Sequence, residues 1–310
     1  MTRLISIVTP CFNEVDNVDE LVRRISAVME QVPYDYEHIF IDNASTDGTV
    51  DRIKAVAAGD RRVKLIRNAR NFGHIRSPFY GILQGSGDAT ICIASDLQDP
   101  PELIPDFIAK WEEGYPIVLG VKPESDESWW KFKLRRIYYR LSTRISEVPL
   151  IENATGSGLI DRRVVEVLRT IDDPYPYYRG LLAELGFPLA TIPFRQPNRV
   201  AGKTKNNFYT LFDMAWLGIT SHSRVPLRLT VIIGFISSVL SLLIAFGFLV
   251  AKLAFWDQFQ LGIAPILIGV FFFGSVQLFS VGVLGEYVAA IHMQVKKRPL
   301  VVELERVNFD

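Results

Sequence analysis

The stretch that decides the fold is residues 89–102, "ATICIASDLQDPPE". Its apolar first half predicts a buried strand at 89–95, and the two prolines near its end stop that strand. An amphipathic segment at 101–114 follows directly and predicts a helix. Between strand and helix stand Asp96 and Gln98, whose side chains point the same way on an extended chain. A buried strand that leads through polar residues into a helix is the repeating unit of α/β proteins.

The same alternation extends over residues 1–125. The predicted strands are 4–9, 38–42, 63–68, 89–95 and 116–121, and the predicted helices are 14–32, 49–59, 75–86 and 101–114. Continuous apolar strands that alternate with amphipathic helices predict an α/β fold with a mostly parallel sheet, covered by helices on both faces. In such sheets, ligands bind at the carboxyl ends of the strands.

Polar or acidic groups follow four of the predicted strands at the point where each strand ends. The residues there are Pro10, Asn13 and Glu14 after the first strand, Asp42 and Asn43 after the second, Asn68 and Asn71 after the third, and Asp96 and Gln98 after the fourth. Each one alone is explained by a turn or a helix cap. Four strands that deliver such groups to one edge of a sheet predict a shared site.

The carboxylate of Asp96 and the amide of Gln98 are oxygen ligands of the kind that Mg²⁺ and Mn²⁺ prefer. A single carboxylate does not hold a divalent ion tightly, but a diphosphate ligand would supply the missing negative charge. The sequence therefore predicts a divalent cation, Mg²⁺ or Mn²⁺, that binds together with a nucleotide diphosphate. A hydrated loop after a strand is the alternative.

The overall composition excludes some function classes. The 310 residues include 34 basic and 34 acidic ones, which gives a formal net charge of +0. Dedicated nucleic-acid-binding domains usually carry a net basic face, so this balance argues against that class. Cys11 and Cys92 stand in apolar, strand-like contexts without a C-x-x-C motif. We predict that both are reduced core residues, which fits a cytosolic environment for this part of the chain.

Two long uncharged stretches stand near the C-terminus, at 229–251 and 263–285. Each exceeds the roughly 20 residues that a helix needs to cross a bilayer, so the sequence predicts a two-helix transmembrane hairpin. Two buried core helices are the alternative. The hairpin is flanked by the basic residues Arg224, Arg228, Lys296, Lys297 and Arg298, whereas its connector has Lys252 as its one basic residue. The positive-inside rule therefore predicts that both termini are cytoplasmic.

Residues 129–145, "WWKFKLRRIYYRLSTRI", are rich in basic residues and contain no acidic one. Read as a helix, they place an apolar stripe beside a basic stripe, which is typical of a helix lying in the membrane interface. Arg135, Arg136 and Arg140 are the candidates for binding a lipid phosphate. A solvated basic helix packed on the sheet is the alternative. Residues 206–224 have apolar side chains at helical spacing and predict a second interfacial helix.

Four motifs occur in a characteristic order before the two predicted spans. They are "SIVTPCFNE" at 6–14, "IDNASTDGT" at 41–49, "ASDLQDPPE" at 94–102 and "NRVAGKTK" at 198–205. This order resembles the polyisoprenyl-phosphate glycosyltransferases of glycosyltransferase family 2, which include dolichol-phosphate mannose synthases and bacterial bactoprenol glucosyltransferases. The resemblance covers nearly the whole chain. It implies a Rossmann-like GT-A fold, a nucleotide-sugar donor with a divalent ion, and inverting transfer of the sugar to a lipid phosphate.

The resemblance implies roles for the residues that follow the first three strands. Pro10 and Glu14 would lie against the nucleoside, with Glu14 on the ribose. Asp42 would hydrogen-bond the base, and Asn71 would belong to the same donor-binding site.

The resemblance implies further roles for four residues around the reacting groups. Asp96 and Gln98 would hold the metal, and Asp96 would thereby take part in catalysis. Arg199 and Lys205 would be catalytic by reaching the phosphates of the donor or the acceptor. Their chemistry suits that role, because an arginine presents a rigid fork to phosphate oxygens and a lysine presents a mobile point charge. A solvated basic loop is the alternative for this pair.

The chain departs from the family pattern at two places. The family usually shows Asp-x-Asp-x-Gln, and Ala94 occupies the first acidic position here. Metal binding should therefore depend more strongly on the donor diphosphate. Many members also carry an Asp-Phe-Arg-like stretch near the middle of the chain, where residues 153–163 read "NATGSGLIDRR". No general base is assigned in that region.

The predicted organisation has four parts. It comprises a GT-A domain at 1–205 that includes a basic interfacial helix at 128–146, a juxtamembrane amphipathic helix at 206–225, two transmembrane helices within 226–290 (about 229–251 and 263–288), and a cytoplasmic tail at 291–310. The small residues of the two spans permit close helix packing, which allows a homo-oligomer without requiring one.

The predicted function is inverting transfer of a hexose to polyprenyl (undecaprenyl) phosphate at the cytoplasmic face of the bacterial inner membrane. Glucose from UDP-glucose is the preferred donor sugar, and the product would serve surface glycan modification. The expected partners are a nucleotide diphosphate sugar, the polyprenyl phosphate lipid and the bilayer, with no nucleic acid. The alternatives are a GDP-mannose-dependent polyprenyl-phosphate mannose synthase and a catalytically weak membrane scaffold that keeps the fold.

Overall fold

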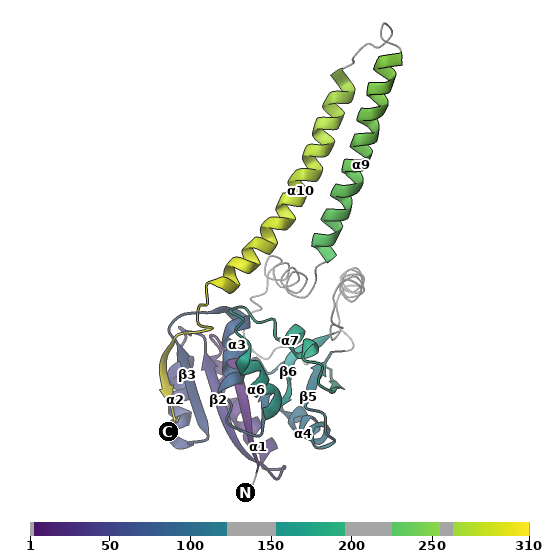
Figure 1. The fold of residues 1–310 in the computed structure, drawn as a ribbon. Coiled ribbons are helices and arrows are strands. Elements are labelled where there is room, and N and C mark those ends of the chain that lie inside the picture. The colour runs from purple at the N-terminus through teal and green to yellow at the C-terminus, as the bar shows by residue number, and fades with distance from the viewer. Residues whose placement is uncertain (1–2, 123–152, 196–224, 255–262, 310) are drawn as a thin grey trace.

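The computed structural model describes residues 3–122, 153–195, 225–254 and 263–309. They form an α/β domain and two long helices that project from it side by side (Figure 1). The basic helix predicted at 128–146 lies outside the described residues, and so does the helix predicted at 206–225 except for its last residue.

An eight-stranded sheet forms the centre of the α/β domain. Its strands, in order across the sheet, are β7 (Leu189–Pro193), β5 (Ile117–Val121), β6 (Ala154–Asp161), β4 (Ala89–Cys92), β1 (Leu4–Cys11), β2 (Asp35–Asp42), β3 (Val63–Asn68) and β8 (Glu303–Val307). β3, β2, β1 and β4 are parallel, as are β5 and β7, whereas β6 and β8 are antiparallel to their neighbours. The predicted mostly parallel sheet is confirmed, and the carboxyl ends of β1 to β4 share one edge.

Helices cover both faces of the sheet, as the alternation of segments predicts (Figure 1). One face packs against α1 (Val18–Met29), α2 (Thr49–Gly59) and α4 (Ile104–Glu112), and the other against α3 (Gly73–Gln84), α6 (Arg162–Thr170) and α7 (Tyr178–Glu184). Two short 3-10 helices, η1 (Val15–Asn17) and η2 (Pro101–Leu103), stand before α1 and α4.

The side-chain alternation of β1 divides the core between the two faces. Ile5 and Ile7 belong to the cluster on the α1 side, and Val8 belongs to a cluster on the α3 side. A Cβ at Gly81 of α3 would lie 2.9 Å from side-chain atoms of both Val8 and Ile41. Because glycine lets α3 approach the sheet this closely, the helix and its N-terminal loop are held firmly over the parallel strands.

β6 lies between β4 and β5 and was not predicted as a strand. Its residue Gly158 pairs with Cys92 on one side and Leu119 on the other. A Cβ there would lie 2.3 Å from the carbonyl oxygen of Val118, so this position requires glycine. The region therefore forms part of the central sheet. It was not predicted as a strand because its two glycines and its polar residues interrupt the apolar pattern of a buried strand.

The tail predicted at 291–310 contains a strand of the α/β domain. β8 pairs antiparallel with β3, and the amide of Ala69 donates a 2.8 Å hydrogen bond to the carbonyl of Val302. The hydroxyl of Tyr80 in α3 donates a 2.8 Å hydrogen bond to Glu303. The strand escaped prediction because "ELERV" has three charged residues in five, a composition that suits an edge strand but shows little apolar signal.

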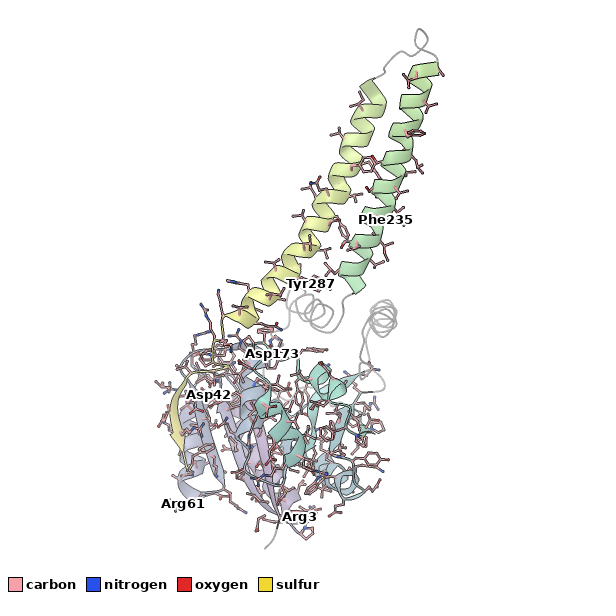
Figure 2. The ribbon with its side chains drawn as sticks, viewed as in Figure 1. Arg3, Asp42, Arg61, Asp173, Phe235 and Tyr287 are labelled. Atoms are coloured by element: carbon pink, nitrogen blue, oxygen red, sulfur yellow. The ribbon has the colours of Figure 1, made fainter. Side chains whose placement is uncertain are left out.

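The predicted spans fall within α9 (Val225–Ala254) and α10 (Ile263–Val295). Large apolar side chains are exposed along both helices; Phe235, for example, is 69% exposed (Figure 2). Within the part of the chain that the structure describes, 272–295 is the one helical stretch long and apolar enough to cross a membrane. In α9, a shorter apolar stretch covers 229–241.

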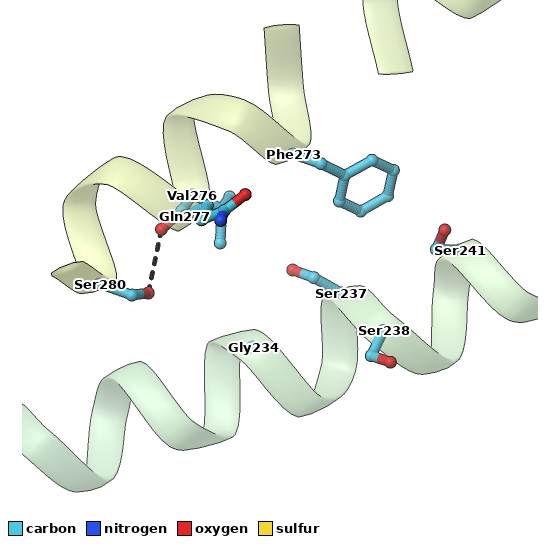
Figure 3. A pocket seen from close by; sticks show the side chains of 8 residues that line it. All are labelled: Gly234, Ser237, Ser238, Ser241, Phe273, Val276, Gln277 and Ser280. Carbon is cyan, nitrogen blue, oxygen red and sulfur yellow. Dashed lines mark hydrogen bonds between the residues drawn. The ribbon is translucent and has the colours of Figure 1, made fainter. Parts of the chain in front are cut away.

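A groove of about 580 Å³ opens between α9 and α10 (Figure 3). Its lining consists of Gly234, Ser237, Ser238, Ser241, Phe273, Val276, Gln277 and Ser280. The hydroxyl of Ser280 donates to the carbonyl of Val276 in its own helix, at 2.9 Å. A glycine and three serines of α9 thus face a mixed apolar and polar surface of α10, away from the strand ends of the α/β domain.

Candidate active site

The loops that follow β1 and β2 are joined to each other at the carboxyl edge of the sheet. The amide of Asn13 donates a 2.8 Å hydrogen bond to Oγ of Ser45, and Oδ1 of Asn13 accepts a 2.7 Å hydrogen bond from the amide of Thr46. The amide of Glu14 donates to Oγ1 of Thr49 at 3.0 Å. Asn13 has a φ of 58°, a conformation that asparagine tolerates better than most residues. Two of the predicted donor-binding segments therefore form one rigid unit.

Asp42 ends β2 and is fully buried (Figure 2). Its Oδ2 accepts a 3.0 Å hydrogen bond from the amide of Ser45, so the carboxylate holds the turn that follows the strand. Burial, followed by the negative charge of Asp42, raises the pKa of the neighbouring Cys11 thiol well above its usual value. The structure thus places Asp42 under the site. That Asp42 hydrogen-bonds the base of a nucleotide stays a prediction.

Pro10 and Glu14 flank this unit. Pro10 is half-buried at the end of β1, where it pairs with Ile41. Glu14 is half-buried, and its Oε2 accepts a 2.7 Å hydrogen bond from Nδ2 of Asn17. Both lie at the carboxyl edge where the sequence predicts a nucleoside-binding surface.

A network of asparagines fixes the loop after β3. Nδ2 of the buried Asn43 donates a 2.9 Å hydrogen bond to Oδ1 of Asn71, and its Oδ1 accepts a 2.8 Å hydrogen bond from the amide of Phe72. Nδ2 of Asn68 donates to Oδ1 of Asn43 at 3.2 Å and to Oγ of Ser77 at 3.0 Å. Asn71 is itself exposed and held in place. The supporting roles of Asn43 and Asn68 were missed, although both stand directly at strand ends.

The predicted metal-binding loop follows β4. Asp96 and Gln98 are half-buried, and the amide of Gln98 donates a 3.2 Å hydrogen bond to Oδ1 of Asp96. Between them, Leu97 has a φ of 57°, which lies in the left-handed region that β-carbon-bearing residues rarely adopt. The extended geometry that the sequence analysis assumed at 96–98 is therefore wrong: the chain turns sharply at Leu97, and Asp96 and Gln98 lie in one tight turn.

The sequence interpretation missed Asp99, the next residue of this loop. Asp99 is buried, and its Oδ2 accepts a 2.5 Å hydrogen bond from Oγ of Ser157 in β6. Burial raises the pKa of Asp99; Ser157 opposes that shift, Asp96 adds to it, and Arg179 and Lys122 oppose it. Two carboxylates and two cations thus act on one another near the carboxyl ends of β4 and β5 and the amino-terminal half of β6. A contact between residues 58 positions apart leaves no local signal in a sequence.

The donor set of this loop decides whether a divalent ion fits. Among the described residues, no group of three or more His, Cys, Asp or Glu side chains is arranged to hold a metal. The loop offers the carboxylate of Asp96 and the amide of Gln98, both oxygen donors at the surface of the site. These residues fit a hard divalent ion whose remaining ligands would come from a substrate and from water.

Five predicted phosphate-binding residues lie outside the described residues. They are Arg135, Arg136, Arg140, Arg199 and Lys205.

The fold and the loops at the carboxyl edge of the sheet together define a class of protein. The parallel strands follow the order β3-β2-β1-β4. Two joined loops stand at the carboxyl ends of β1 and β2, and an acidic loop follows β4. This is the arrangement of a GT-A glycosyltransferase. Residues 6–169 match the model for "Glycosyl transferase family 2". The chain belongs to that family.

Several curated proteins are similar to the chain over nearly its full length. An uncharacterized glycosyltransferase of Synechocystis sp. is 35% identical, and the match covers 97% of this chain and 94% of that protein. A prophage-derived bactoprenol glucosyl transferase of Shigella flexneri is also 35% identical, with 95% and 96% covered. The putative glycosyltransferase CsbB of Bacillus subtilis is 32% identical, with 99% and 94% covered.

Solved structures confirm the fold. Glucosyl-3-phosphoglycerate synthase of Mycobacterium tuberculosis, in a complex with Mn²⁺, UDP and phosphoglyceric acid, superposes with a TM-score of 0.51. The two chains are 22% identical, and the superposition covers 70% of this chain and 76% of that one. At this identity, the similarity establishes a common architecture.

Proposed function

We propose that this protein transfers glucose from UDP-glucose to polyprenyl phosphate, with inversion, in the presence of Mg²⁺ or Mn²⁺. The observation that carries the proposal is the turn of Asp96 and Gln98 at the carboxyl end of β4, beside the joined loops of β1 and β2. The full-length similarity to a bactoprenol glucosyl transferase supports both the lipid acceptor and the sugar. The Mn²⁺ and UDP bound to a structural neighbour support the donor class.

Each part of the edge has a task in this reaction. The surface around Pro10 and Glu14 would hold the nucleoside, with Asn71 fixed beside it by Asn43. Asp96 and Gln98 would hold the divalent ion, which neutralises the charge of the donor diphosphate. The ion's remaining ligands would come from the diphosphate and water, because Ala94 supplies no carboxylate.

The acceptor needs little activation by a base. Its phosphate monoester has a second pKa near 6 by analogy with phosphoserine, so it is mostly a dianion at pH 7. The larger obstacle is repulsion, because two unit charges about 4 Å apart cost roughly 4 kcal/mol at an effective dielectric constant near 20. The enzyme should therefore work through positioning and charge neutralisation. No general base is assigned in the region 153–163, where β6 (Ala154–Asp161) supplies the hydrogen bond from Ser157 to Asp99 of the loop after β4.

Lipid phosphate would be received by basic segments near the membrane. We assign Arg135, Arg136 and Arg140 to the acceptor phosphate. Arg199 and Lys205 would act on the phosphates as a cationic lid. An arginine-rich interfacial helix at 128–146 and an amphipathic helix at 206–225 would hold the domain against the lipid surface, where each cation near anionic lipid adds about 1 kcal/mol.

We further propose that α9 and α10 form a transmembrane hairpin in the bacterial inner membrane, with the α/β domain and both termini cytoplasmic. Exposed apolar side chains along both helices support this, because such a surface is unfavourable in water. The start of α9 and the end of α10 point toward the α/β domain (Figure 1), which agrees with basic residues at the outer ends of the predicted spans. The small residues of the two spans permit close helix packing, which would allow a homo-oligomer without requiring one.

The experiment is a transfer assay with the purified full chain and a short-chain polyprenyl phosphate. We expect glucose transfer from UDP-glucose that requires Mg²⁺ or Mn²⁺ and falls sharply in Asp96→Ala and Gln98→Ala. Asp106→Ala, an exposed carboxylate on α4, is the matched control and should keep full activity. Transfer from GDP-mannose alone would instead identify a mannose synthase. A folded protein that transfers no sugar from any donor would be a membrane scaffold, and undiminished turnover in the first two variants would refute the role of the turn.

A further inference from the structure

Asp99 is the buried carboxylate of the loop after β4. It is 5% exposed, and its hydrogen-bond donor, Ser157 of β6, is 1% exposed. Oδ1 of Asp99 has no hydrogen-bond partner within the described part of the chain. A buried carboxylate with an unused oxygen costs stability, because that oxygen has given up its water without replacing it. A loop that keeps such a group needs it for something other than packing.

The loop is anchored on both sides of Gln98. On one side, Leu97 is 2% exposed, and its side chain belongs to the core cluster on the α1 side. On the other side, Asp99 is tied to Ser157. Gln98 stands between these two anchored neighbours, so its backbone has little conformational freedom. The amide of Gln98 in turn holds the carboxylate of Asp96 through its hydrogen bond.

The anchor point of Asp99 lies on a strand that cannot easily shift. Ser157 precedes Gly158, which pairs with β4 and β5 at once and leaves no space for a Cβ. The hydrogen bond from Ser157 therefore fixes the loop after β4 relative to the central sheet. A ligand set is tuned by the groups that orient it as well as by the ligands themselves.

We propose that the hydrogen bond between Ser157 and Asp99 positions the turn of Asp96 and Gln98 for binding the divalent cation. Asp99 is a positioning residue: it acts through this hydrogen bond and does not contact the ion. The inference rests on the proposed function of the turn in metal binding.

The test measures Mn²⁺ binding directly. The full chain in detergent is titrated with Mn²⁺ at saturating UDP, and free Mn²⁺ is followed by electron paramagnetic resonance. Ser157→Ala and Asp99→Ala should each weaken Mn²⁺ binding about tenfold, a typical effect of removing a group that orients a metal ligand. Asp99→Asn keeps a side-chain oxygen that accepts the serine hydroxyl, so its affinity should stay close to that of the wild type.

Ser6→Ala is the matched control. Oγ of Ser6 in β1 donates a 2.5 Å hydrogen bond to the buried Glu37 in β2, again a serine hydroxyl paired with a carboxylate. Ser6 stands five positions before the carboxyl end of β1 at Cys11. This variant should lose thermal stability as Ser157→Ala does, yet bind Mn²⁺ like the wild type. The comparison separates a positioning role from a general loss of stability.

Two results would overturn the proposal. One is unchanged Mn²⁺ affinity in Ser157→Ala. The other is an Asp99→Asn variant as weak as Asp99→Ala, since the charge of Asp99 would then matter rather than its hydrogen bond. Failure of the wild type to bind Mn²⁺ with UDP would refute the metal role of the turn as well. Binding by the wild type with unchanged variants would refute the positioning role alone.

Discussion

Replacing Gly158 by alanine tests how firmly β6 is held in the centre of the sheet. The added Cβ would lie 2.3 Å from the carbonyl oxygen of Val118 and 2.8 Å from Cδ2 of Leu119. A relaxed carbon–oxygen contact measures about 3.3 Å or more, so β5 and β6 must part by about 1 Å. A backbone hydrogen bond lengthened by that amount is outside the normal range.

The expected cost follows from these distances. Overpacking a filled interior costs about 1–3 kcal/mol, and each weakened backbone hydrogen bond costs about 0.5–1.5 kcal/mol. We expect Gly158→Ala to lower the free energy of unfolding by about 3 kcal/mol. For a domain of this size, the Tm should fall by about 6–12 °C. Because Ser157 is the neighbouring residue, Mn²⁺ binding should weaken in the same variant.

Gly156→Ala, two positions earlier on the same strand, is the control. Gly156 is exposed, and nothing lies within 4 Å of a Cβ built there. Its alanine variant should stay within about 0.5 kcal/mol of the wild type. Thermal unfolding of both full-length variants in detergent, followed by circular dichroism, provides the comparison. Equal Tm values for the two variants would refute the close-packing argument.

Three further predictions follow from other parts of the domain. Burial lowers the pKa of His38 to about 3, whereas a histidine in the unfolded chain titrates near 6.5. The free energy of unfolding should therefore fall as the pH drops below about 6.5, by about 2 kcal/mol at pH 5. A His38→Gln variant should show a flatter pH profile of Tm, and an unchanged slope would contradict this. Ala94→Asp adds the carboxylate that the family pattern has, so Mn²⁺ should bind several-fold more tightly at fixed UDP; calorimetry measures this, and weaker binding would argue against a metal site. Asn43→Ala removes the hydrogen bonds to Asn71 and Phe72, which should lower the free energy of unfolding by about 1–3 kcal/mol and weaken UDP binding. UDP affinity equal to that of the wild type would show that the loop after β3 keeps its position without these hydrogen bonds.

Local sequence patterns were sufficient to predict the first half of the fold. The strand predicted at 89–95 and the helix predicted at 101–114 appear as β4, which ends earlier at Cys92, and as η2 with α4. β4 is shorter because its pairing with β1 stops at Val8, after which one more hydrogen bond joins Ile93 to the carbonyl of that residue. Apolar periodicity is set by burial, which is why it located these elements but not their ends.

β6 and β8 could not be predicted from local sequence patterns, because each forms by pairing with strands that are distant in the sequence. β6 contains two glycines, and β8 is mostly charged, so neither carries the apolar pattern of a buried strand. The same limit applies at the site. Asp96 and Gln98 could be singled out because oxygen-bearing side chains follow an apolar strand, but the turn that joins them was not predicted. The bond from Ser157 to Asp99 joins residues that only the folded sheet brings together.

The position of β8 has a consequence for how the protein is made. β8 is synthesised after both α9 and α10, although it pairs with β3 at the edge of a sheet whose other strands all precede those helices. Until then, β3 carries an unpaired edge, which is a surface prone to wrong association. The sheet is therefore complete only after both long helices have been synthesised, so a nascent chain stalled before β8 would be a target for chaperones and proteases.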